Sequence, residues 1–289
     1  MTDWMDLSKR AALQSHRLIG WIYWDPVAIA NLDARGIPNG AGYYVSSRGA
    51  PLGPAGAQAI AAAFYSINPV FIEMAHNITV EHGSYADATV ARDEAVSLGL
   101  REYVPEIVDQ LAAMGAALWA AADGLSLSGR VLFAAHRDAP RRDDPLLSAW
   151  LAVNCIREWR GDTHWALLIA HDLSGVEAGV LHDAHLDYGG WIAGSRGADD
   201  DAIVASIAGL ESKGLATAGK VNQAGLDLRQ RIEDRTDELC QAAWRLLGED
   251  TTKAFIDMME PAGEVLMRRI DDTAGSDWMP AGREPRRAI

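Results

Sequence analysis

Residues 174–226 decide the fold that the sequence predicts: SGVEAGVLHDAHLDYGGWIAGSRGADDDAIVASIAGLESKGLATAGKVNQAGL. Apolar residues recur at spacings of three and four over 174–184 and 199–213, which predicts two helices joined by a glycine-rich connector. Leu215-Ala216-Thr217, a turn at Ala218-Gly219-Lys220 and then Val221 predict a small β-hairpin, and a long helix follows from about residue 223. Helix, helix, hairpin and long helix is the element order of a winged-helix domain.

An earlier stretch of the chain resembles part of this one. Residues 16–50 and 164–198, set against each other without gaps, share seven identities in 35 positions, and four of these form a consecutive Ser-Arg-Gly-Ala. The repeat predicts an internal duplication. We therefore expect an all-α protein, mainly helical with small β-hairpin wings, in which two winged-helix-like lobes are related by a pseudo-twofold axis. The expected lobes are 1–140 and 141–275, and 276–289 is a loose tail or a surface strap.

The remaining pattern is also helical. Ala and Leu dominate, and runs of Val, Ile or Thr with period two are nearly absent. We expect Gly161 to bend or break a long helix at 145–171. Further helices are predicted at 6–24, from Pro26 to Gly36, and at 54–66, 86–100, 105–122, 223–247 and 250–272.

Composition limits the kinds of partner. Acidic residues outnumber basic ones 40 to 26, which gives a net charge of −14 and opposes binding by broad phosphate neutralisation. The helix at 199–213 begins with three Asp residues, and the hairpin offers only Lys220. We therefore do not expect nucleic acid as a partner. No leader segment and no uninterrupted apolar run of 18 residues is present, so the expectation is a cytoplasmic protein that does not meet a membrane.

Three segments carry a resemblance to a known family: YYVSSRGAPLGPAGAQAIAAAFYSINP (43–69), REWRGDTHWALLIA (157–170) and SRGADDDAIVASIAGLESKGL (195–215). They resemble the SalK-like helix-turn-helix family of actinobacteria, and the similarity extends over nearly the whole chain. The resemblance implies a two-lobed, mainly helical protein whose second lobe is similar to a winged helix. It implies no particular activity.

A polar cluster interrupts the apolar, Trp-rich segment 145–171. On a continuous helix Asn154, Glu158 and Asp162 share one face, and Arg157 and His164 lie on another. Charges in such a segment are costly unless they are paired. The cluster is therefore either a buried network of Arg and carboxylate side chains that fixes the junction of the lobes, or the lining of a pocket between them.

The two histidines at equivalent places in the repeat favour the pocket. His16 aligns with His164, and a symmetric pair near a carboxylate suits general acid–base chemistry because imidazole titrates near neutral pH. We expect His164 and His16 to act as catalytic groups, with Glu158 or Asp162 orienting one of them. The expected substrate-binding residues are Tyr23, Arg48, Asn154, Arg160 and Trp165, of which Arg48 and Arg160 would anchor an anionic group.

Three functions remain open from the sequence. The first is a cofactor-independent enzyme, a lyase, isomerase or hydrolase, acting on a small molecule that is apolar with an anionic group. The alternatives are a ligand-responsive helix-turn-helix transcriptional regulator and a ligand-binding protein without chemistry. Histidine pairs 182/185 and 164/171 give only a weak signal for a metal, and haem held by two histidines a weaker one, so no cofactor is expected. Packing of the long C-terminal helices could also produce a homodimer.

Overall fold

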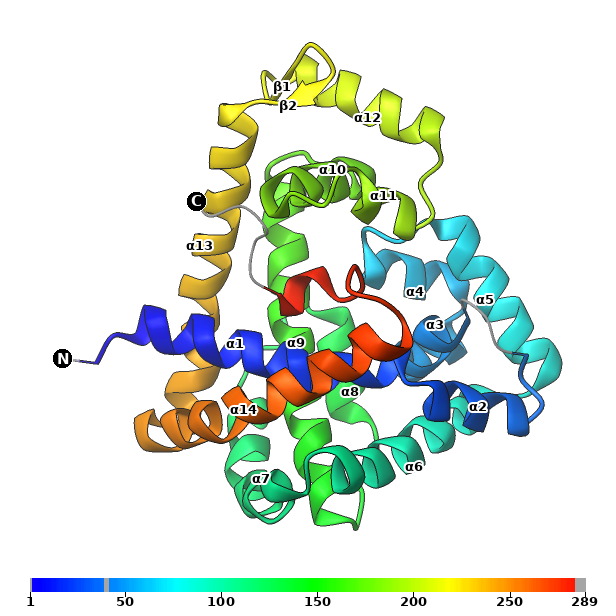
Figure 1. Ribbon diagram of the computed structural model, residues 1–289, viewed down its shortest axis with the longest axis vertical. Helices are drawn as coiled ribbons and strands as arrows, with labels where there is room; N and C mark the ends of the chain where they lie inside the picture. The colour runs from blue at the N-terminus through cyan, green and yellow to red at the C-terminus, as the bar shows by residue number, and fades with distance from the viewer. Residues whose placement is uncertain (1, 39–41, 284–289) are drawn as a thin grey trace.

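The computed structural model describes residues 2–38 and 42–283, and it confirms an all-α architecture (Figure 1). The helices are α1 (Trp4–Gly20), α2 (Pro26–Ala34), α3 (Gly42–Arg48), α4 (Ala57–Phe64), α5 (Pro69–His82), α6 (Tyr85–Tyr103), α7 (Val108–Asp123), α8 (Val131–Asp138), α9 (Pro145–Ala170), α10 (Gly175–Leu186), α11 (Trp191–Ser195), α12 (Asp200–Ser212), α13 (Gln223–Leu247) and α14 (Glu249–Thr273). Short 3-10 segments are η1 (Trp21–Trp24), η2 (Ala50–Ala55), η3 (Pro105–Ile107) and η4 (Pro280–Gly282).

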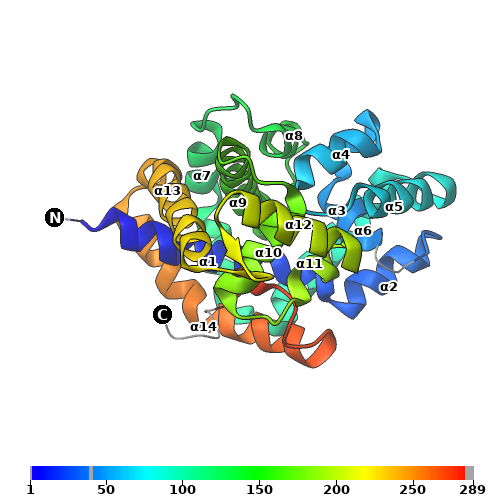
Figure 2. The ribbon, with the colours of Figure 1, turned by 90° about the horizontal axis from the view of Figure 1, so that it is seen from above.

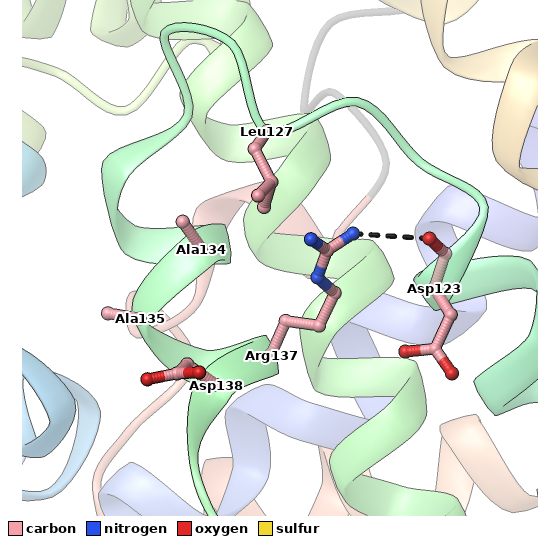
Figure 3. A pocket seen from close by; sticks show the side chains of 6 residues that line it. All are labelled: Asp123, Leu127, Ala134, Ala135, Arg137 and Asp138. Atoms are coloured by element: carbon pink, nitrogen blue, oxygen red, sulfur yellow. Dashed lines mark hydrogen bonds between the residues drawn. The ribbon is translucent and has the colours of Figure 1, made fainter.

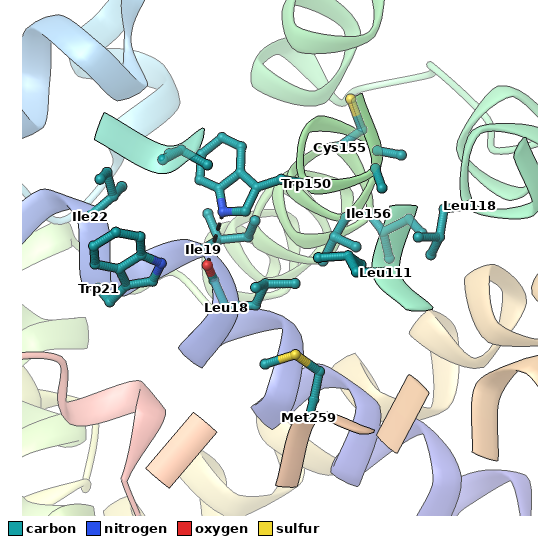
Figure 4. Packing of buried hydrophobic residues seen from close by; sticks show 14 of the residues in the cluster. Leu18, Ile19, Trp21, Ile22, Leu111, Leu118, Trp150, Cys155, Ile156 and Met259 are labelled. Atoms are coloured by element: carbon teal, nitrogen blue, oxygen red, sulfur yellow. Dashed lines mark hydrogen bonds between the residues drawn. The ribbon is translucent and has the colours of Figure 1, made fainter. Parts of the chain in front are cut away.

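Helix α9 is the central element. It runs through the middle of the molecule and is crossed by α1, beside which α14 lies (Figure 1). The largest apolar cluster surrounds this crossing, and it takes residues from both sides of residue 140. At its centre the fully buried Trp150 of α9 donates its indole N–H to the carbonyl oxygen of Leu18 at 2.9 Å (Figure 4). The predicted boundary between lobes at 140 and 141 stays a prediction.

Helix α9 begins where the sequence predicts and continues past the expected break. Asp144 accepts the amide of Leu146 and Pro145 occupies the first turn, which together start the helix. The helix then continues through Gly161 to Ala170, so the predicted break at Gly161 is wrong, whereas a bend there stays a prediction. Tertiary packing along the whole of α9 outweighs the helix propensity that a single glycine loses.

The second half of the chain contains the predicted hairpin. Strands β1 (Ala216–Thr217) and β2 (Lys220–Val221) pair antiparallel, and both turn residues, Ala218 and Gly219, have positive φ angles. Such a two-residue turn matches the twist of the strands. The capping box of Ser174 and Glu177 starts α10, and Asp199 caps α12. The order of α10, α12, hairpin and α13 is therefore the order that the sequence predicts, while the short helix α11 within the glycine-rich connector was not predicted.

The first half differs from the second, and the expectation of a second hairpin wing there is wrong. At the corresponding place, after α4, Asn68 caps the unpredicted helix α5, whose first residue is Pro69. Within residues 2–38 and 42–140 the structure contains no strand. His16 and His164 both lie near the C-terminal ends of long helices, but this agreement does not establish a duplication, which stays a prediction.

The chain end forms a strap over the surface. Trp278 stacks against Trp24 with ring centroids 4.1 Å apart and meets Trp191 edge-on at 4.9 Å. Met279 is buried and packs beside Gly20. Residues 276–283 of the predicted tail are thus a strap, and 284–289 lie outside the described residues. Across the described chain, no helix combines the length and hydropathy that a membrane span needs.

The continuity of α9 predicts the effect of filling Gly161. A Cβ atom there would lie 3.7 Å from its nearest neighbour, Glu158 Oε2, so Gly161→Ala should stabilise the protein by about 0.5–1 kcal/mol. Gly99→Ala in α6 is the contrasting variant, because its Cβ would lie 2.4 Å from the Trp21 ring. Urea unfolding should show opposite signs, and a destabilising Gly161→Ala would contradict an unbroken α9.

Candidate functional site

A buried ion-pair network joins α3 to α9. Arg48 donates from Nε and Nη2 to the two carboxylate oxygens of Glu158, at 2.9 and 2.6 Å, and Arg157 donates to Oε1 at 2.5 Å. Only 1% of the Glu158 side chain is exposed. Burial raises the pKa of Glu158, but Arg48 and Arg157 overcome this and hold it well below its usual value. Glu158 is therefore an anion neutralised by two guanidinium groups.

A second network joins α9 to α13. Arg160 Nη2 donates to Glu233 at 3.0 Å and to Asp237 at 2.9 Å, and Arg229 donates to the other oxygen of Glu233 at 2.5 Å. Arg229 is almost fully buried, and its neighbours on α13, Leu228 and Ile232, belong to an apolar cluster. The arginines and carboxylates thus form the ionic network that was one of the two interpretations of the polar segment.

His164 is held as a neutral imidazole. Its Nδ1 lies 3.0 Å from Thr236 Oγ1, and the Thr236 hydroxyl donates to the carbonyl oxygen of Ile232. His164 therefore donates from Nδ1, which leaves Nε2 unprotonated. Burial lowers the pKa of His164 to about 3, and it lowers that of His136 to about 4. Within the described residues no hydrogen bond joins either His16 or His164 to Glu158 or Asp162, so the expected orienting role of these carboxylates is wrong.

The faces of α9 separate the predicted residues. Asn154, Glu158 and Asp162 face the first half: Asn154 donates to His136 at 3.2 Å, and Asp162 accepts the amide of Phe133, at the start of α8, at 2.9 Å. Burial raises the pKa of Asp162 to about 6. Asp162 is thus committed to holding the first turn of α8, which the sequence did not predict as a helix.

The other face carries the groups nearest to one another. Burial holds the pKa of His16 well below its usual value, and the positive charges of Arg157 and Arg160 lower it further. Arg160 also lowers the pKa of His164. Tyr23 is buried, and burial raises its pKa to about 12. Trp165 stacks on Tyr65 with centroids 5.3 Å apart and meets the His164 ring edge-on at 5.4 Å. The structure therefore brings Arg160, His164 and Trp165 together, places His16 near Arg157 and Arg160, and places Tyr23 near Arg157 and Glu158.

Three members of this region, all on α13, were not predicted from the sequence. Arg229, Glu233 and Thr236 recur at spacings of three and four on the buried face of α13, which is a signal that could have found them. Arg196 and His182 extend the group, with Arg196 Nη2 3.5 Å from His182 Nδ1. Burial, followed by Arg229 and Arg48, lowers the pKa of Arg196 to about 10. Tyr44 accepts from Arg48 at 2.7 Å.

The surface hollow between α7 and α8 is a different feature. It encloses about 640 Å³ and is lined by Asp123, Leu127, Ala134, Ala135, Arg137 and Asp138 (Figure 3). Arg137 donates to the carbonyl oxygen of Asp123 at 3.2 Å. None of the predicted site residues lines this hollow. Over residues 2–38 and 42–283 the structure shows no group of three or more His, Cys, Asp or Glu side chains that could hold a metal ion.

Comparison with known proteins adds the family. A family model described as "Helix-turn-helix family" matches residues 8–271. The chain belongs to this helix-turn-helix family. A search of the curated proteins and a search of the solved structures found no match.

This membership corrects the expectation that nucleic acid is not a partner of the helix-turn-helix protein. A helix-turn-helix is a DNA-binding motif, so the family match overturns an expectation that rested on net charge, on three Asp residues and on a single lysine in the hairpin. One of these Asp residues, Asp199, caps α12 through the amide of Ala202, so its carboxylate reflects helix stability rather than the choice of partner. The match supports the regulator alternative and gives no support to the enzyme hypothesis.

The first network predicts a strong response to removal of one charge. Glu158→Gln leaves Arg48 and Arg157 without a buried counter-charge and should cost about 3–5 kcal/mol in the free energy of unfolding. Glu260→Gln, which breaks the exposed pair with Arg10, should cost less than about 1 kcal/mol. Urea unfolding measures both, and equal losses would contradict the assignment of Glu158 as the buried anchor.

The buried histidines predict a pH effect. A pKa of about 3 keeps His164 neutral from pH 8 to 5, so its imidazole signals should not shift in NMR over that range. In the urea-unfolded chain the histidines titrate near ~6.5. The unfolded state therefore binds more protons below ~6.5, and the stability of the helix-turn-helix protein should fall as the pH falls. A His164 signal that titrates near neutrality would refute this.

Proposed function

We propose that the protein is a ligand-responsive helix-turn-helix regulator that binds duplex DNA through α10–α13. The observation that carries this proposal is the order of two helices, hairpin and long helix in a member of a helix-turn-helix family. In that order α12 takes the place of the recognition helix, which enters the major groove. Leu210 is the one fully buried residue of α12, and the rest of the helix keeps exposed surface for a partner.

The hairpin supplies a phosphate contact. Lys9, Lys213 and Lys253 each lie in an ion pair with a carboxylate. Lys220 is the remaining lysine of the four in the chain. It is exposed in β2 and has no ion-pair partner in the described part of the chain. The hairpin and α12 lie together at one end of the molecule, uncovered by other elements (Figure 2). Lys220 is thus placed to meet the DNA backbone while α12 reads the groove.

The proposed contact with DNA depends little on salt. Asp200 and Asp201 are exposed in the first turn of α12 and repel phosphates, so the backbone contact falls to Lys220. One neutralised phosphate corresponds to a slope of about −1 for log affinity against log salt. This small electrostatic contribution leaves specificity to hydroxyl and apolar side chains of α12, such as Ser206 and Val204.

The ionic network of α9 and α13 provides the route for a ligand response. Helix α9 leads through Ser174 into α10, and α13 follows directly from the hairpin. Arg160 and His164 of α9 bind Glu233 and Thr236 of α13, so these contacts set the position of α13 relative to α10. A ligand that binds the arginines differently in two positions of α13 shifts the balance between them.

The lysine of the hairpin offers the direct test. Lys220→Glu should weaken binding to a random 30-bp duplex pool by ~3- to 10-fold in fluorescence anisotropy at about 50 mM salt. Lys253→Glu in α14 carries the same charge change far along the chain and should bind as the unaltered protein does. Absence of duplex binding by the unaltered protein at low salt, or equal loss in both variants, would overturn the proposed function.

A further inference from the structure

We propose that the interior beside α9 is a binding site for an aromatic carboxylate, held by Arg157, Arg160 and Arg229 and flanked by His16 and His164. An aromatic carboxylate would be the ligand of the ligand-responsive regulator proposed above, so this inference rests on that part of the proposed function alone. It does not depend on DNA binding.

The first observation is a surplus of buried donors. Five polar atoms around this side of α9 are buried and have no hydrogen-bond partner in the described ranges 2–38 and 42–283: Tyr23 Oη, Arg157 Nε, Arg160 Nε, Trp165 Nε1 and Arg229 Nη1. Arginine and tryptophan nitrogens can only donate. Each buried donor left unpaired costs about 1–3 kcal/mol. The site is therefore short of acceptors.

The neighbouring carboxylates do not fill this shortage. Glu158 already accepts three N–H groups, two from Arg48 and one from Arg157. Glu233 accepts from both Arg160 and Arg229, and Asp237 accepts from Arg160. A bound carboxylate brings two further oxygens, and its planar shape matches the guanidinium fork.

The second observation is a glycine in the middle of the donor stripe. Arg157, Arg160, Gly161 and His164 recur at spacings of three and four, so they share one face of α9. Gly161 is half-buried, and a Cβ built on it would make ordinary van der Waals contact with Glu158 Oε2 at 3.7 Å and with Arg48 Nη2 at 4.0 Å. In the proposed site, the ligand lies where a larger side chain at Gly161 would lie.

The third observation is the local charge. His16 retains accessible surface, and no protein hydrogen bond to its ring is found among the described residues. Burial holds its pKa well below the usual value, and Arg157, Arg160 and Arg48 lower it further while Glu158 opposes them. Arg196 has no ion pair with a carboxylate among residues 2–38 and 42–283. Such surroundings favour an anion.

Aromatic side chains around the site favour a ligand whose apolar part is an aromatic ring. Trp165 and Tyr65 stack near His164, and on the other side Tyr23 and Tyr44 meet edge-on with centroids 5.0 Å apart. Flat apolar walls around a few convergent polar groups are typical of small-molecule sites. An aromatic acid satisfies the walls and the donors together, whereas inorganic phosphate satisfies only the donors.

Calorimetric titration of the full chain without DNA tests the site. Benzoate should bind with a dissociation constant of about 1 mM or tighter, as a nine-atom ligand allows. Gly161→Leu removes no charge and no hydrogen bond but fills the space beside the arginines, and it should weaken benzoate binding by at least ~10-fold. Gly194→Leu in α11, where a Cβ meets nothing within 4 Å, is the matched control and should bind benzoate normally.

Benzylamine and inorganic phosphate complete the experiment. Benzylamine, with the same ring and the opposite charge, should not bind, and Arg157→Gln should lose benzoate binding as Gly161→Leu does. No heat with benzoate, equal binding of benzylamine, binding of phosphate but not benzoate, or full benzoate affinity in Gly161→Leu would each overturn the site. Normal benzoate binding in a protein that does not bind DNA would refute the proposed function and leave this site standing.

Discussion

The structure depends on one buried contact, the pairing of Glu158 with Arg48 and Arg157. A carboxylate that is almost fully buried cannot remain charged without compensation, and the two guanidinium groups supply it from α3 and from α9 itself. The requirement fixes the end of α3 against the middle of α9. His136 supports the same contact, because its Nε2 donates to the carbonyl oxygen of Arg48 at 2.9 Å.

Helix α9 has two polar faces that contact different parts of the chain. Asn154, Glu158 and Asp162 bind side chains and amides of α3 and α8, and all three are buried. Arg160 and His164 reach α13 instead. One continuous helix therefore connects the first half of the chain to the unit that carries the hairpin. This connection is the physical basis on which occupancy in the interior could be transmitted to α12.

Much of the fold could be predicted from the sequence, because strong local signals agree with the tertiary structure there. The hairpin at 215–221 and the helix at 223–247 were predicted closely, since turn residues and apolar spacing coincide. Helices α5 and α8 were missed. Asn68-Pro69 is a standard helix start that was not used, and α8 depends on Asp162, 29 residues from the amide that it caps.

The candidate site was predictable in part for the same reason. The stripe of charges on α9 is visible in one segment of sequence, so His164 and Arg160 could be selected. Their partners on α13 could not be paired with them, because Arg160 and Glu233 are 73 positions apart. Charge composition misled the choice of partner, since the carboxylate of Asp199 caps α12 and so reflects helix stability.

The strap at the chain end has a consequence for biosynthesis. Trp278 touches Trp24 near the start of the chain and Trp191 beside the hairpin unit, so it links segments made at very different times. The aromatic junction therefore cannot close before Trp278 has been synthesised and has left the ribosome tunnel. A truncated product that stops before Trp278 would leave the rings of Trp24 and Trp191 without this cover.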